Sequence, residues 1–204
     1  MKRINLHIDD SPTNPMERGD GEWTLYSFNS RHISYKNPDK FLPPSLGLRR
    51  KLDVGTAFLL SYYEHSGCVW SLQGDGPQCR WDSVQCAGIL LWEHPVSNMG
   101  AKTYEDRAKD AASFLETYTC WCNGEVYGYE IEDVTNCKEC GHEIVKDDPD
   151  GSCWGFYGSD IAYMAEEVRA ALGDAIGKEE IVISGDASWL ADHHDFIGKK
   201  EKAA

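Results

Sequence analysis

A run of cysteines between residues 120 and 153 constrains this chain more than any other feature of its sequence. Five of the eight cysteines fall in this stretch, as a CxC pair, a CxxC pair and a single cysteine. The first residues lack the apolar segment of a signal peptide, so we expect the protein to stay in the reducing cytoplasm. There, cysteines clustered at short spacing are typical of a metal site rather than of disulfides.

The CxxC pair belongs to a Cys-Lys-Glu-Cys-Gly-His sequence at residues 137–142. In such a turn two thiolates converge on one metal, and the glycine lets the backbone bend beneath it. Tetrahedral zinc needs four ligands, and we therefore predict a structural Zn²⁺ ion with Cys137 and Cys140 as its firmest ligands. The stretch offers six candidate ligands: Cys120, Cys122, Cys137, Cys140, Cys153 and His142.

The spacing leaves open which cysteines complete such a site. If residues 125–131 form one continuous strand, Cys122 and Cys137 end up roughly 25–30 Å apart, at ~3.3 Å per residue. If the chain bends back near Gly128, the CxC and CxxC pairs meet. Cys153 is a third possibility, reaching the CxxC pair across a hairpin. The competing interpretation is that these cysteines are buried free thiols of the core.

Hydrophobic patterning predicts an α+β fold, with an antiparallel sheet of about five to seven strands, two main helices and a cysteine-rich, zinc-knuckle-like hairpin insert. Alternating or continuously apolar runs indicate strands at 22–28, 56–63, 87–92, 125–131, 153–157 and 181–183. Thr103, with Asp106 three residues later, is typical of a helix start. A second helix is expected from Ser159 or Asp160 to Gly173.

The length of 204 residues suits one domain of ordinary size. We predict an irregular N-terminal arm over residues 1–21, where prolines and glycines interrupt any periodicity. A single α+β domain is expected over 22–198, with the cysteine-rich hairpin at 120–158. Residues 199–204 are expected to be a flexible tail.

The formal net charge of −14 restricts the partners of this chain. Nucleic acid backbones need cationic contacts, so direct binding of DNA or RNA is not expected. The charge has two other interpretations: it keeps a small protein soluble, or arrayed carboxylates imitate nucleic acid phosphates and occupy a basic groove on a partner. No apolar run approaches the ~20 residues needed to cross a bilayer, so no membrane association is expected either.

Catalysis has little support in the sequence. Phosphate-binding loops, dinucleotide-binding glycine motifs and nucleophile elbows are all missing. Glu64 and His65 place a carboxylate beside an imidazole at the end of a strand, which is the chemistry of a general base. A small hydrolase or nucleotide-modifying enzyme with a site near Glu64, His65 and Asp82 is therefore the alternative to a binding protein.

Several segments together resemble a group of uncharacterised bacteriophage-encoded proteins that share a GEVYGY…SCWGFYG hairpin. The most specific of them are Gly124–Tyr129 and Ser152–Gly158, and weaker likeness extends over about residues 9–170. The resemblance implies an acidic accessory protein of the host cell cytoplasm that binds and inhibits a host protein. The expected target is a nucleic-acid-targeting defence system, as for anti-restriction or anti-CRISPR proteins.

Under that interpretation, carboxylates of the central helix and hairpin form the partner-binding face. They are Glu105, Asp106, Asp110, Glu116, Glu130, Glu132 and Asp133. A third possibility is a zinc-stabilised scaffold that binds a phage or host protein without inhibiting it.

Overall fold

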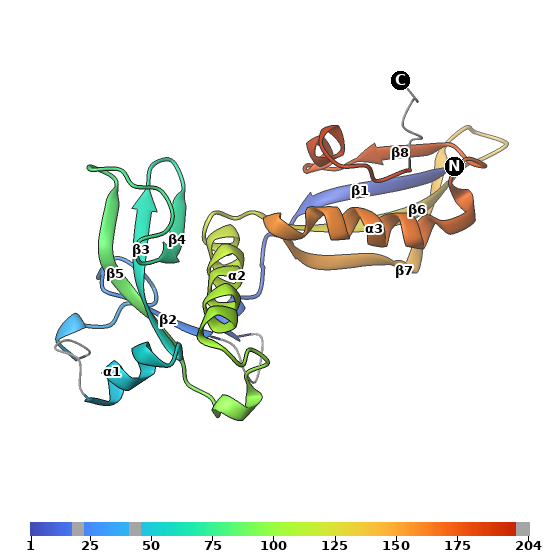
Figure 1. The fold of residues 1–204 in the computed structure, drawn as a ribbon. Helices are drawn as coiled ribbons and strands as arrows, with labels where there is room; N and C mark the ends of the chain where they lie inside the picture. The colour runs from blue at the N-terminus through green and yellow to red at the C-terminus, as the bar shows by residue number, and fades with distance from the viewer. Residues whose placement is uncertain (18–22, 41–45, 199–204) are drawn as a thin grey trace, which may run out of the picture. The chain divides into compact units, whose positions relative to one another are not determined.

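The structure, a computed structural model, describes residues 1–17, 23–40 and 46–198 (Figure 1). These residues hold eight strands and three α-helices, which confirms the α+β class. They form two compact units: unit 1 comprises Met1–Pro12 with Gly124–Ala204, and unit 2 comprises Thr13–Asn123. The single domain predicted over 22–198 thus includes parts of both units. The predicted tail at 199–204 and part of the predicted arm lie outside the described residues.

Unit 1 is a four-stranded sheet in the order β7-β6-β1-β8. Strand β1 (Lys2–Ile8) is antiparallel to β6 (Val126–Asn136) and parallel to β8 (Ile181–Ser184), while β7 (Glu143–Tyr157) pairs with β6 at the edge. Helix α3 (Ile161–Leu172) packs on one face of this sheet.

The prediction of an irregular arm over residues 1–21 is wrong at its start, where strand β1 forms. Its residues alternate, with Ile4 and Leu6 fully buried and polar side chains between them. The buried pair packs with Met164 and Val168 of α3 in the core of unit 1. The prolines and glycines that suggested an arm all come after Ile8, so the interruption begins where the strand ends.

Close packing in unit 1 explains why the GEVYGY…SCWGFYG hairpin has a glycine at Gly128 opposite Trp154. A Cβ atom on Gly128 would lie 2.3 Å from the indole ring of Trp154, so only glycine leaves room for that ring. The indole in turn stacks on His7 of β1, with ring centroids 5.7 Å apart. Gly155 is the extra residue of a β-bulge, because Tyr127 pairs with Phe156 and Gly128 with Trp154.

Unit 2 is an antiparallel sheet in the order β2-β5-β3-β4. Its strands are β2 (Trp23–Ser27), β3 (Ala57–Glu64), β4 (Cys68–Leu72) and β5 (Ser83–Trp92). Helix α2 (Tyr104–Cys122) buries one side against this sheet, in a core rich in aromatic residues. Helix α1 (Leu46–Asp53) contributes Leu48 to a smaller core with Ala57, Ile89 and Leu91.

Helix α2 begins where its sequence indicates. The Thr103 hydroxyl accepts a hydrogen bond from the Asp106 amide at 3.1 Å, which satisfies one amide of the first turn. Ala111, Leu115 and Tyr118 are buried on one face, as the apolar spacing predicts. Within the described residues, no helix is both long and apolar enough to span a membrane.

The prediction that the strands pair in a single sheet of five to seven strands is wrong. The described strands divide into two sheets of four, one of which contains a parallel pair. Alternation of side chains shows that a segment is a strand, but it carries no information about the neighbouring strand. The stretch between the halves of the recognisable hairpin also extends β6 and β7, with pairs from Glu132↔Asp147 to Asn136↔Glu143.

Candidate functional site

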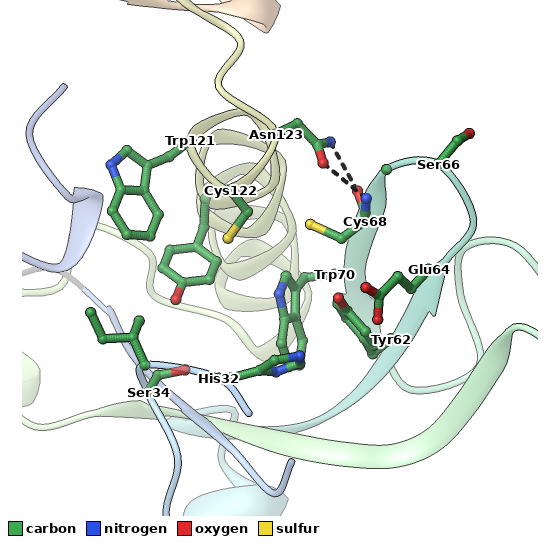
Figure 2. A pocket seen from close by; sticks show the side chains of 13 residues that line it. His32, Ser34, Tyr62, Glu64, Ser66, Cys68, Trp70, Trp121, Cys122 and Asn123 are labelled. Carbon is green, nitrogen blue, oxygen red and sulfur yellow. Dashed lines mark hydrogen bonds between the residues drawn. The ribbon is translucent and has the colours of Figure 1, made fainter. Parts of the chain in front are cut away.

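A pocket of about 430 Å³ opens on unit 2. Three parts of the chain enclose it: the segment 32–34, the hairpin of β3 and β4, and the last turns of α2 (Figure 2). All of these belong to unit 2, so the pocket is contained in one compact body. Its volume lies within the roughly 300–1,000 Å³ of typical small-molecule sites.

Aromatic side chains form the walls. Tyr62 of β3 and Trp70 of β4 are direct cross-strand partners, and their ring centroids lie 4.6 Å apart. The His32 ring meets both edge-on, at 4.8 Å from Tyr62 and 5.5 Å from Trp70. On α2, Tyr118 and Trp121 stand one turn apart with centroids separated by 5.5 Å. Several aromatic rings therefore line the pocket in a small volume.

Polar groups lie at the rim and hold it together. The Asn123 side chain accepts a hydrogen bond from the Cys68 amide at 2.8 Å and donates one to the Cys68 carbonyl at 3.0 Å. Figure 2 shows these two bonds joining the end of α2 to the start of β4. Glu64 hydrogen-bonds the Tyr62 hydroxyl, and this contact adds to burial, the main cause, in raising the Tyr62 pKa.

Two thiols and a hydroxyl complete the lining. The side chains of Cys68 and Cys122 share a hydrogen bond, which together with burial raises the pKa of Cys122. Burial, with a smaller effect of the neighbouring Cys122, raises the pKa of Tyr118 to about 12. The buried Ser34 hydroxyl lies beside the Tyr118 phenol without a well-formed hydrogen bond in the described part of the chain. The Cys122 thiol and the Tyr118 phenol are therefore neutral at pH 7.

His32 is held in its neutral form. Burial lowers its pKa, and this outweighs the opposing effect of Glu64, while Arg31 lowers it a little further. Its Nδ1 atom lies 2.8 Å from the Ser27 hydroxyl, which is fully buried. The imidazole therefore acts as a packed aromatic ring between Ser27 and the pocket.

Unit 2 is expected to lose stability as the pH falls below about 6.5. The His32 pKa is lower in the folded than in the unfolded chain, so the unfolded chain binds more protons between the two values. The stabilisation is complete above the unfolded value and disappears as the pH falls through the folded one. Urea unfolding at pH 7.5 and 5.5 measures the loss, and His32→Gln should reduce it. An equal loss in that variant would contradict the assignment to His32.

The predicted catalytic residues are only partly brought together. Glu64 lines the pocket, but His65 and Asp82 do not. His65 Nδ1 lies 3.5 Å from Asp82 Oδ2, and the Cys79 thiol donates to the same carboxylate oxygen at 3.3 Å. The imidazole and the thiol thus contact the same oxygen of Asp82, and neither of them lines the pocket. This arrangement gives the enzyme alternative no specific support.

Only the CxxC cysteines meet at the hairpin tip. The Cys137 sulfur accepts backbone hydrogen bonds from Cys140 and Glu139, and these, with the Cys140 side chain, lower its pKa. The turn is closed by Gly141, whose amide donates to the Cys137 carbonyl at 2.9 Å, and by a 2.8 Å bond from the Cys137 amide to the His142 carbonyl. Backbone amides directed at a sulfur favour a thiolate, which is the form that binds metal.

His142 belongs to the same turn through its carbonyl, whereas the other predicted cysteine ligands lie elsewhere. Cys153 pairs with Tyr129, ten residues beyond Glu143 and so on the order of 30 Å along β7 from the tip. Cys120 and Cys122 are in the last turn of α2, which belongs to unit 2. Over residues 1–17, 23–40 and 46–198, no three histidine, cysteine or acidic side chains converge as a metal site.

The predicted partner-binding carboxylates divide into two sets. Four belong to α2 of unit 2 and are exposed: Glu105, Asp106, Asp110 and Glu116. The three on β6 of unit 1 face side chains of β1: Glu132 lies 3.5 Å from the Arg3 cation, Asp133 3.0 Å from the Lys2 cation, and Glu130 3.9 Å from the His7 ring. Because cations partly neutralise the β6 set, the α2 set is the less compensated acidic surface.

Sequence reasoning missed most of the pocket. Glu64 was singled out, but Tyr62, Trp70, Tyr118 and Trp121 come from three separate elements whose meeting no spacing reveals. The only local signal was the density of aromatic residues around the ends of β3 and α2. Comparison of the chain with families of known proteins, with curated proteins and with solved structures gives no match.

Proposed function

We propose that the protein is an acidic accessory protein, of the kind encoded by bacteriophages, that binds and inhibits a host protein in the host cytoplasm. The proposed target is a nucleic-acid-targeting defence system, in the manner of anti-restriction or anti-CRISPR proteins. The net charge of −14 supports this, because proteins that handle nucleic acids carry basic grooves that attract a strongly acidic surface.

The exposed carboxylates of α2 carry the proposal. Glu105 and Glu116 are eleven residues apart, which is about three helical turns, so they lie on the same side of the helix. Asp106 occupies the exposed first turn beside them. A row of carboxylates on a rigid helix is the arrangement that imitation of a phosphate backbone requires, and α2 is rigidly held by its buried face.

The proposal is tested with purified protein that carries a charge reversal on α2. The measurements are capture of a target from host lysate and inhibition of that target. The double variant Glu105→Lys/Glu116→Lys should bind a target captured from host lysate at least tenfold more weakly, and the loss should shrink at high salt. A matched control, Glu166→Lys/Glu180→Lys, reverses two exposed carboxylates of unit 1 and should leave binding unchanged. Equal binding by both variants, or capture of no nucleic-acid-binding protein, would refute the proposal.

The same experiment separates this function from a zinc-stabilised interaction scaffold. Both bind a partner, but an inhibitor lowers the nuclease or DNA-binding activity of the captured protein, and a scaffold leaves that activity intact.

We further propose that the hairpin tip binds Zn²⁺ through Cys137 and Cys140. The support is the pair of thiols at one turn, with backbone amides directed at the Cys137 sulfur. Because tetrahedral zinc needs four ligands, the remaining positions must be filled by groups from outside this pair.

Replacing both tip cysteines, in Cys137→Ser/Cys140→Ser, is expected to abolish zinc binding. Serine keeps the size of the side chain but lacks the thiolate that the metal requires. Metal analysis of the purified protein measures the zinc content, and Cys79→Ser serves as the control. Retention of zinc by the double variant would show that the ion is bound elsewhere.

A further inference from the structure

The pocket on unit 2 has the composition of a site for a positively charged group. Tyr62, Trp70, Tyr118 and Trp121 surround it with aromatic rings. The faces of such rings carry negative electrostatic potential and attract a cation within about 6 Å of the ring centroid. Tryptophan gives the strongest interaction of this kind, and two of the four rings are tryptophan.

The charged side chain that lines the pocket has the matching sign, and Arg31 stands beside the lining next to His32. Glu64 is the one formally charged side chain among its lining residues, and neither lysine nor arginine lines it. His32 is neutral because burial lowers its pKa. The chain as a whole carries a net charge of −14, which raises the local concentration of cations and repels anions.

The two most polar side chains at the rim are already engaged, which leaves hydroxyls such as that of Ser34 for a ligand. The Asn123 amide is already occupied by the Cys68 backbone, and the Glu64 carboxylate is held against Tyr62. A ligand that gains its affinity from aromatic faces and charge, with no need of directional hydrogen bonds, therefore fits best. An alkylated ammonium group has these properties, because its charge is spread over a surface of methyl groups.

We propose that this pocket binds an alkylated ammonium group, either on a small molecule or on a methylated lysine side chain. Such a site goes beyond the proposed inhibition, because it requires neither the α2 carboxylates nor a host target. The rings of Tyr62 and Trp70 form one wall, Trp121 the opposite one, and Glu64 compensates the charge at the rim (Figure 2).

The first measurement uses purified full-length protein and choline, with 3,3-dimethylbutanol as its neutral isostere. Choline should shift the indole N–H resonances of Trp70 and Trp121 in an NMR titration, and the neutral isostere should bind at least tenfold more weakly. Guanidinium ion at the same concentration should also be weaker than choline. Equal shifts with choline and its neutral isostere would overturn the proposal, and so would shifts confined to other tryptophans.

The second measurement uses matched variants. Glu64→Gln and Trp121→Leu should each weaken choline binding about tenfold or more. Their controls, Asp75→Asn and Trp81→Leu, change an exposed carboxylate and an exposed indole of the same unit outside the pocket and should bind normally. Trp121→Phe keeps an aromatic ring and should restore most of the affinity. Unchanged binding by folded Glu64→Gln and Trp121→Leu would place the cation elsewhere.

A third measurement distinguishes an alkylated ammonium group on a small molecule from one on a methylated lysine side chain. A peptide with trimethyllysine that binds more tightly than choline, with its unmodified-lysine counterpart at least tenfold weaker, assigns the site to a protein side chain. Binding of choline without the peptide assigns it to a small molecule. If neither binds, the proposal is wrong, whereas the charge-reversal test on α2 is unaffected because it needs no pocket ligand.

Discussion

Gly185→Ala is expected to destabilise unit 1 by about 2–6 kcal/mol, since overpacking and a strained backbone each cost about 1–3 kcal/mol. Gly185 has a φ of +95°, and a Cβ atom there would lie 2.1 Å from the Leu6 carbonyl oxygen. That oxygen also accepts a hydrogen bond from the Ala187 amide at 3.0 Å. The clash is therefore with the backbone of β1, which cannot move without leaving the sheet.

Urea unfolding gives the size of this effect, and hydrogen exchange locates it in β1, β6 and β8. Gly177→Ala is the matched control, because Gly177 also has a positive φ of +78° but has open space where the Cβ would be. It should lose only about 1–2 kcal/mol, the usual cost of a left-handed backbone for a residue with a side chain. Similar losses in the two variants would show that β1 does not approach Gly185 so closely.

Leu115→Ala is expected to cost unit 2 about 2–5 kcal/mol, the usual range for removing a buried leucine. Leu115 is only 1% exposed and lies in the core between α2 and the sheet, among Trp23, Phe58 and Trp92. Aromatic rings of this size cannot collapse into the space that the leucine leaves, so a cavity remains. The loss should therefore fall in the upper part of the range.

Tryptophan fluorescence during urea unfolding measures this change, because unit 2 contains most of the tryptophans. Lys109→Ala alters an exposed position of the same helix and should stay within about 0.5 kcal/mol of the unaltered protein. If Leu115→Ala cost no more than Lys109→Ala, the packing of α2 on the sheet would be refuted.

Helices α2 and α3 and most strands could be predicted because their signals are local, whereas α1 was not predicted. Thr103 starts α2 by bonding an amide three residues away, and Gly173 follows α3 directly, so both ends are visible in a short window of sequence. Strand β1 was missed because the following prolines and glycines masked a seven-residue alternation. Strand β4 was missed because its single polar residue interrupts an apolar run without producing an alternation.

Only the contacts that lie within one turn of the chain could be predicted for the candidate site. Cys137 and Cys140 meet because hydrogen bonds within one turn bring them together. Cys122 was grouped with them by sequence distance, whereas it hydrogen-bonds Cys68, more than fifty residues earlier. The pocket likewise depends on the pairing of β3 with β4 and on the Asn123 side chain, and such long-range contacts leave no periodic trace in the sequence.

The sheet of unit 1 has a consequence for the order in which the chain folds during synthesis. Strand β1 leaves the ribosome first, but its partners β6 and β8 follow only after all of Thr13–Asn123 has been made. Unit 2 is contiguous and can pair its own strands at once, whereas β1, with its apolar Ile4 and Leu6, must wait. A nascent chain halted near residue 123 would thus hold one completed unit and one unpaired strand exposed to chaperones.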